Sequence, residues 1–82
     1  MNPLTDITDV VRTTVKLMVD SPRDVVVECW PIEGGASLRI TVASDDLGKL
    51  IGKQGRTARA LRVLASAMGM TAKQHISLDI NE

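Results

Sequence analysis

Apolar side chains recur every three or four residues over the first part of the chain, which is the spacing of an amphipathic helix. This spacing predicts a helix over about residues 4–19, with Asn2 as its cap and Pro3 at its first position. Ser21-Pro22 predicts the end of this helix. The side chains that we expect to pack on a sheet are Ile7, Val10, Val11, Thr14, Val15 and Met18.

Three later segments have the composition and alternation of β-strands. Residues 24–30 are rich in valine, residues 37–42 alternate between apolar and polar side chains, and residues 76–80 carry an apolar side chain at every second position. Gly34-Gly35 lies between the first two segments and predicts a hairpin.

Two more helices are predicted between the second and third strands. Asp45-Asp46 offers a cap for a short helix that runs to Ile51, and a longer helix is predicted over residues 56–68, where Gly69 ends it. At about 100° per residue, one face of the longer helix is apolar and should point into the core. This face consists of Leu61, Leu64, Ala65 and Met68. The order is α-β-β-α-α-β, an α+β arrangement in one small domain of residues 1–82.

The composition narrows the chemistry. Trp30 is the only aromatic residue, so aliphatic side chains must fill the core and base stacking on aromatic platforms is nearly excluded. Cys29 is the only cysteine, which rules out an internal disulfide or a cysteine-rich zinc site and indicates a reducing compartment. No signal peptide and no apolar run of membrane-spanning length are evident, so we expect a cytoplasmic protein without a metal or cofactor.

A net charge of zero hides a segregation of charge along the chain. Residues 47–75 contain no Asp or Glu and carry a charge of +6. The basic residues of this segment are Lys49, Lys53, Arg56, Arg59, Arg62 and Lys73. A neutral protein with one basic surface still binds anions there, because the local field decides the contact. The alternative is an ordinary solvated helix face.

The most informative segment runs from Leu50 to Arg56, where two glycines three residues apart join the apolar end of one helix to the basic start of the next. Gly52 and Gly55 have no Cβ, so they can adopt positive φ and let another chain come close. The helix that begins near Arg56 offers free N–H groups to an anion. The segment therefore predicts a phosphate-binding loop.

Catalysis is not indicated by the residues. A nucleotide-binding P-loop needs four residues between its glycines and Ser or Thr after its lysine, whereas three residues separate Gly48 from Gly52 and Gln54 follows the lysine. Cys29 and His75 would have to be adjacent and oriented by a third group to act as nucleophile and base. Cys29, beside valines, is expected to be a small core residue.

In this context Gly52-Lys53-Gln54-Gly55 resembles the GxxG loop of a K-homology (KH) domain of type II, whose element order is also α-β-β-α-α-β. The resemblance covers essentially the whole chain. A KH domain with so little before or after it is similar to the small bacterial KhpA family of RNA-binding proteins. The resemblance implies a three-stranded sheet packed on one side by three helices, and a non-catalytic module that clamps the backbone of about four nucleotides of single-stranded RNA.

The resemblance also assigns roles to residues of this chain. It implies that Gly52 and Gly55 admit the phosphates, that Lys53 and Gln54 project at the loop tip, and that the helix starting near Arg56 contributes its amides. It places Ile51 on the floor of the groove and gives Lys49, Arg59 and Arg62 a role in steering the strand. The expected function is that of a broad-specificity RNA chaperone or post-transcriptional regulator.

Two kinds of protein partner are expected. The resemblance implies a homodimer, or a heteromer with a larger KH-containing protein of the KhpB family. The residues themselves suggest a partner face, because Val63 lies among arginines on the predicted outer side of its helix, with Ala60 and Ala67 beside it. This apolar patch leaves a second interpretation open, in which the chain is a protein-interaction module and its GxxG loop is ancillary.

Overall fold

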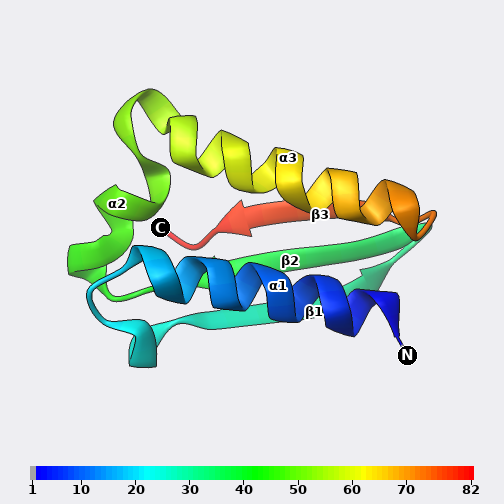
Figure 1. Ribbon diagram of the computed structural model, residues 1–82, viewed down its shortest axis with the longest axis horizontal. Helices are drawn as coiled ribbons and strands as arrows, with labels where there is room; N and C mark the ends of the chain where they lie inside the picture. The colour runs from blue at the N-terminus through cyan, green and yellow to red at the C-terminus, as the bar shows by residue number, and fades with distance from the viewer. Residues whose placement is uncertain (1) are drawn as a thin grey trace.

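A layer of helices covers one face of a three-stranded sheet (Figure 1) in the computed structural model, which describes residues 2–82. The elements are, in chain order, α1 (Pro3–Met18), β1 (Val26–Ile32), β2 (Gly35–Thr41), α2 (Leu47–Ile51), α3 (Arg56–Thr71) and β3 (His75–Ile80). The α+β class, the α-β-β-α-α-β order and the one-sided packing of the helices are therefore confirmed. The first two strands lie within two residues of their predicted bounds.

The strands lie in the order β1-β2-β3, with β1 antiparallel and β3 parallel to β2. A parallel pair needs a long crossover connection, and the segment that contains α2 and α3 provides it. As a result α1 and α3 lie side by side on one face of the sheet, while α2 lies at one end of the molecule (Figure 1).

The core lies between the helices and the inner face of the sheet. Its most deeply buried side chains include Leu38 and Ile40 of β2 and Leu50 of α2, each at most 1% exposed. Each large aliphatic side chain buried in this way stabilises the fold by about 1.5–3 kcal/mol. The other apolar members of the core are Ile7, Val11, Val15, Val25, Val27, Ala36, Leu61, Ala65, Ile76 and Leu78.

Helix α1 starts as predicted but buries a narrower face. Asn2 Oδ1 accepts a hydrogen bond from the Leu4 N–H at 3.0 Å, with Pro3 at the first helical position. Val10 is 44% exposed, so its assignment to the core was wrong. Thr8 is buried instead. Its hydroxyl tolerates burial because it donates a hydrogen bond to the Leu4 carbonyl at 2.7 Å.

Helix α3 does not end at Gly69, which contradicts the prediction. Gly69 is buried inside the helix, where an added Cβ would lie 2.5 Å from both the Gln74 carbonyl oxygen and the Ile76 side chain. Glycine therefore lets the start of β3 approach the helix closely. The left-handed residue past the helix end is Lys73, with φ 58°. Leu64, predicted to be in the core, is 38% exposed.

The predicted hairpin joins β1 to β2 through Glu33-Gly34, with Gly34 at φ 79°. Gly35 is already part of β2. Cys29 was expected to be a small core residue, and this is wrong because the thiol lies on the exposed part of the edge strand β1.

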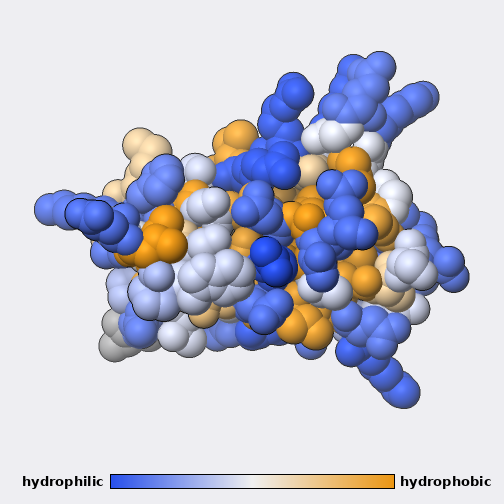
Figure 2. Space-filling view, turned by 180° about the vertical axis from the view of Figure 1, so that it is seen from behind, coloured by the Kyte–Doolittle hydropathy of each residue, from blue (hydrophilic) through white to orange (hydrophobic). Residues whose placement is uncertain are grey.

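The outer face of the sheet carries both polar and apolar side chains, and Figure 2 shows apolar atoms interrupted by polar groups on the side opposite to that of Figure 1. The strand register places Arg39 between Glu28 and Asp79 on this face. The Arg39 guanidinium also lies 5.6 Å from the centre of the Trp30 ring, a cation–π contact. The only aromatic residue is thus paired with a cation of the sheet.

Candidate nucleic-acid interface

The glycine loop projects from the end of the molecule where α2 leads into α3 (Figure 1). Gly52 has φ 76° and ψ 172°, and Gly55 has φ 74° and ψ 15°. Gln54 between them is also left-handed, with φ 58°. The Gly55 N–H donates to the Gly52 carbonyl at 3.1 Å, so the loop is a defined turn.

Space as well as conformation requires glycine at position 52. An added Cβ on Gly52 would lie 2.3 Å from Thr57 Oγ1 and 2.9 Å from the Thr57 backbone nitrogen. A Cβ on Gly55 would meet no atom of residues 2–82 within 4 Å, so only its positive φ favours glycine there. The open side at Gly55 leaves room for another chain to approach.

The N-terminus of α3 lies at the end of this loop. Gly55 is its N-cap residue, and no side chain of the described residues makes a capping hydrogen bond there. The helix is 16 residues long, so its first N–H groups carry the positive end of a full helix dipole. This arrangement favours an anionic group at the loop.

The side chains predicted to contact RNA surround the loop. Lys53 and Gln54 are exposed at its tip, and Arg56 and Arg59 are exposed on the first turns of α3. Arg56 Nη2 lies 3.4 Å from Gln54 Oε1, a long hydrogen bond. Ile51, half-buried, follows the buried Leu50. Within residues 2–82, no ion pair involves the three basic side chains of this group.

Lys49 differs from the other basic residues because its ammonium group forms a hydrogen-bonded ion pair with Asp20. This hydrogen bond raises the pKa of Lys49 above its ordinary value of 10.5. A raised pKa means that the ion pair contributes its full stability below about pH 10.5 and loses this contribution as the pH rises through the raised pKa. The pair connects α2 to the segment that follows α1.

Asp46 makes a second connection at the same place. Its carboxylate is 1% exposed and accepts the backbone N–H groups of Asp20 at 3.1 Å and of Ser21 at 3.0 Å. The sequence predicted Asp45-Asp46 as the cap of α2, and Asp46 does occupy the N-cap position, but its side chain makes no capping hydrogen bond there. It instead satisfies two amides released at the end of α1. Asp46 thereby fixes the start of α2, and with it the approach to the glycine loop.

Arg62 has a structural contact that sequence reasoning missed. Its Nε donates to the Leu78 carbonyl of β3 at 3.1 Å. β3 is an edge strand, so this carbonyl gains a partner from the helix above it. Arg62 therefore holds α3 on the sheet, and Lys53, Arg56 and Arg59 are the cations that lie nearest in sequence to the loop without an ion-pair partner among the described residues.

The outer side of α3 carries the predicted partner face. Ala60, Val63 and Ala67 are all exposed, and Val63 is 63% exposed. Together with Arg56, Arg59 and Leu64 they line a shallow depression of about 520 Å³. The exposed Leu64 makes this patch more apolar than the sequence suggested.

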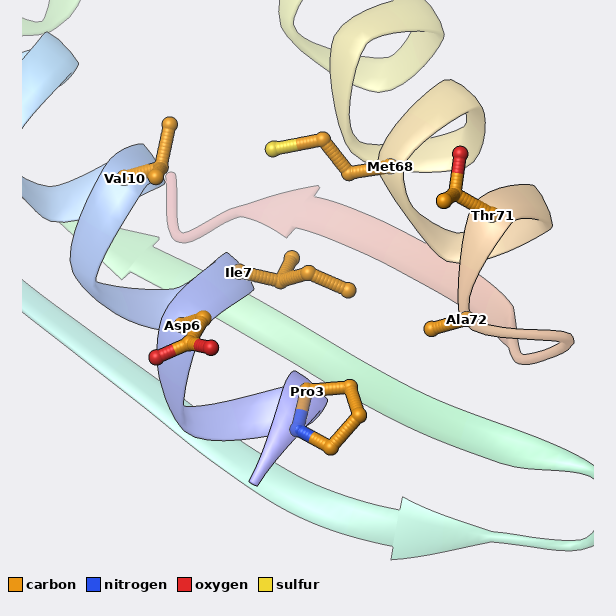
Figure 3. Close-up of a pocket in the computed structure, with 7 residues that line it drawn as sticks. All are labelled: Pro3, Asp6, Ile7, Val10, Met68, Thr71 and Ala72. Atoms are coloured by element: carbon orange, nitrogen blue, oxygen red, sulfur yellow. The ribbon is translucent and has the colours of Figure 1, made fainter. Parts of the chain in front are cut away.

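A cleft of about 560 Å³ lies between α1 and the C-terminal end of α3. Figure 3 shows Ile7 and Met68 pointing into it from the two helices. Among the described residues that line it, Asp6 is the only charged one, and these residues do not provide the paired groups of an acid–base site. Residues 2–82 contain no cluster of three His, Cys, Asp or Glu side chains that could hold a metal. No helix in this range is long and apolar enough to cross a membrane.

The element order, the mixed sheet and the Gly52–Gly55 loop between two helices define a type II KH domain. The chain belongs to the KhpA/KhpB family, because the family model described as KhpA/KhpB, KH domain matches residues 8–80. The resemblance to KhpA that the sequence suggested is thus confirmed.

Curated relatives include three bacterial proteins named RNA-binding protein KhpA. The Listeria monocytogenes protein is 36% identical over 74 residues, which cover 90% of this chain and 97% of the relative. The Treponema pallidum protein is 42% identical over 72 residues, which cover 88% and 90%. The Streptomyces coelicolor protein is 51% identical over 55 residues, which cover 67% and 70%.

Solved structures of Era have a similar fold. Aquifex aeolicus Era bound to GDP.AlF4- matches with a TM-score of 0.70 and 15% identity over 98% of this chain, which spans 31% of the Era chain. Era in complex with MgGDPNP and nucleotides 1506–1542 of 16S ribosomal RNA gives the same TM-score, and this chain spans 30% of it. At this identity the likeness establishes the fold alone.

Proposed function

We propose that this protein is a non-catalytic RNA-binding module that clamps the backbone of single-stranded RNA at the Gly52–Gly55 loop. The observation that carries the proposal is the loop itself, in which two positive-φ glycines lead to a helix N-terminus without a side-chain cap among the described residues. The exposed Lys53 and Gln54 lie at its tip. The curated relatives, each named as an RNA-binding protein, support the same conclusion.

The proposed contacts divide by chemistry. The glycines admit the phosphates, the α3 amides and the basic side chains bind them, and the apolar side chain before the loop contacts a base. The residues that make these contacts are Ile51, Gly52, Lys53, Gln54, Gly55, Arg56 and Arg59. Backbone contacts of this kind carry little sequence information, which fits a broad-specificity RNA chaperone or post-transcriptional regulator acting in the cytoplasm, without a cofactor.

The outer side of α3 is the proposed partner face. The exposed patch around Val63 and the depression beside it favour a second copy of the chain or a KhpB-type protein as the partner. Pairing would join two weak RNA sites and raise their combined affinity without a new RNA contact. The same patch supports the second candidate function, a protein-interaction module whose loop is ancillary.

The loop is tested with the double variant Lys53→Asp plus Gln54→Asp. We expect its affinity for a short labelled single-stranded RNA to fall at least about tenfold, because two carboxylates then face the phosphates. Fluorescence anisotropy at several salt concentrations measures this loss, and the wild-type affinity should fall as salt rises.

A matched control variant changes the net charge by the same amount at positions that are distant from the loop in the sequence. Thr13→Asp plus Lys16→Asp alters two exposed positions of α1 and lowers the net charge by the same amount. It should bind RNA nearly as well as the wild type. Equal RNA binding by the folded loop variant would instead favour the interaction-module function.

Lys49 offers a separate prediction, because it is either a phosphate contact or a support for α2. Exchanging the pair, with Asp20→Lys and Lys49→Asp together, restores an ion pair of reversed polarity. We expect the exchanged protein to bind RNA within about twofold of the wild type, while Lys49→Asp alone weakens binding because it faces Asp20. The exchanged protein could instead lose as much RNA affinity as Lys49→Asp alone, with the slope of log affinity against log salt reduced by about one. This result would show that Lys49 contacts a phosphate.

A further inference from the structure

The free edge of β1 borders a groove that the RNA clamp does not use. The groove has a volume of about 480 Å³ and lies between α1 and β1. Its walls come from the polar side of α1, which includes Thr8, Asp9 and Arg12, and from the inner side of β1, which includes Val27, Cys29 and Pro31. Figure 1 shows β1 at the margin of the sheet, with α1 running alongside it.

The strand register shows which backbone groups of β1 point away from the sheet. Val27 lies opposite Ile40, and the Ile40 carbonyl accepts the Asn81 N–H beyond β3, so it faces away from β1. In an antiparallel pair the bonded positions alternate, so Val27, Cys29 and Pro31 direct their backbone groups to the free edge. Pro31 has no N–H and fits such a position.

These outward-facing backbone groups can form hydrogen bonds with a strand added at the edge. The edge offers the N–H and C=O of Val27, the N–H and C=O of Cys29, and the C=O of Pro31. The row of outward-facing groups ends at Val25, whose N–H already donates to the Pro22 carbonyl at 3.2 Å. A strand that pairs with this edge places alternate side chains in the groove under α1.

The charged side chains near the β1 edge indicate which kind of segment would bind there. Of the acidic residues in the segment 3–33, Asp6 lines the α1–α3 cleft and Asp20 pairs with Lys49, whereas Asp9 lines the groove. Arg12 in the groove is neutralised by Asp9 at 2.7 Å. Glu28 and Glu33 lie on β1 and its turn without an ion-pair partner among the described residues. The edge therefore repels RNA and attracts a basic segment.

A second copy pairing through the same edge fits less well. In a twofold β1–β1 pairing the missing Pro31 N–H occurs twice, and the acids of one copy oppose the acids of the other. A basic strand from another protein meets Pro31 once and finds opposite charge. We propose that the α1–β1 groove binds a basic, extended segment of a partner protein by strand addition at the β1 edge.

The test uses the blocked peptide Lys-Val-Lys-Val-Lys-Val-Lys, which presents lysines on one face and valines on the other. We expect amide NMR shifts in the wild-type protein at Val27, Cys29 and the facing side of α1. The acidic peptide Glu-Val-Glu-Val-Glu-Val-Glu, and a Lys-Val peptide N-methylated on its bonding amides, should each bind at least about tenfold more weakly.

A protein variant removes the edge donor. Cys29→Pro deletes an N–H that faces outward and leaves the β1–β2 hydrogen bonds in place. We expect it to lower peptide affinity at least about tenfold, with RNA binding unchanged, while Cys29→Ser keeps the N–H and binds normally. The Lys53→Asp plus Gln54→Asp variant should bind the peptide like the wild type, which separates this site from the clamp.

The proposal is overturned by any of three results. One is that peptide shifts lie on the Gly52–Gly55 loop or on α3 instead of at β1. Another is equal binding of the N-methylated and unmodified peptides to the wild-type protein, a comparison that does not depend on the folding of any variant. The third is sedimentation showing a dimer that Cys29→Pro dissociates and Cys29→Ser does not, because the edge would then belong to a second copy.

Discussion

Asp46→Ala is expected to lower the free energy of unfolding by about 3–5 kcal/mol. Each hydrogen bond to a charged group contributes about 1.5–3 kcal/mol, and the buried Asp46 carboxylate accepts two of them. The substitution also leaves the Asp20 and Ser21 amides without their partner. Native proteins have a total stability of about 5–15 kcal/mol, so the variant would lose a large fraction of it. Urea denaturation monitored by circular dichroism measures the loss.

Two further variants make the Asp46 measurement specific. Asp45→Ala removes the neighbouring, exposed carboxylate and should change stability by less than about 0.5 kcal/mol. Asp46→Asn keeps one acceptor oxygen and turns an amide donor toward the other N–H, so its loss should be intermediate. A stability of Asp46→Ala within about 1 kcal/mol of the wild type would show that Asp46 does not hold the end of α1.

Gly52→Ala is expected to cost about 2–4 kcal/mol and to displace the RNA loop. Its φ of 76° with ψ of 172° lies in a region that is essentially restricted to glycine, which costs about 1–3 kcal/mol for other residues. The new Cβ would also lie 2.3 Å from Thr57 Oγ1, so the start of α3 must move. Because that helix start carries the proposed phosphate contacts, RNA affinity should fall with stability.

The other glycines of this region provide a graded series for comparison. Gly48→Ala lies in α2 with nothing within 4 Å of its new Cβ, and should stabilise the protein by about 0.5–1 kcal/mol. Gly55→Ala has open space but a φ of 74°, so a loss of about 1–2 kcal/mol is expected. Equal losses at Gly55 and Gly52 would contradict the role of the Thr57 contact.

The amino-acid pattern was sufficient to predict the elements, because both periodicities are local. The helical spacing over α1 and the alternation in β2 and β3 each require only neighbours along the chain. The glycine loop could also be predicted from the sequence, since Gly52 and Gly55 have the positive φ that glycine readily adopts. The resulting α-β-β-α-α-β order matched the structure.

Errors arose where a side chain depends on distant partners. Asp46 resembled a helix cap, but its two donors lie 26 and 25 residues away in the chain. Gly69 resembled a helix end, but β3 packs so closely there that only glycine fits within the helix. Cys29 lies among valines in sequence, yet the fold leaves it on an edge strand.

The sequence by itself determined the α+β class, the order of elements, the family and the segment that forms the loop. The class, the order and the loop follow from local periodicity, from glycine conformation and from the acid-free stretch around the loop, whereas the family follows from the resemblance to KhpA proteins. Only the tertiary structure decided the roles of individual charges: Lys49 is held by Asp20, Arg62 by the Leu78 carbonyl, and Lys53 stands exposed at the loop tip. The reason is that a charge acts through its spatial neighbours, which packing brings together from distant parts of the chain.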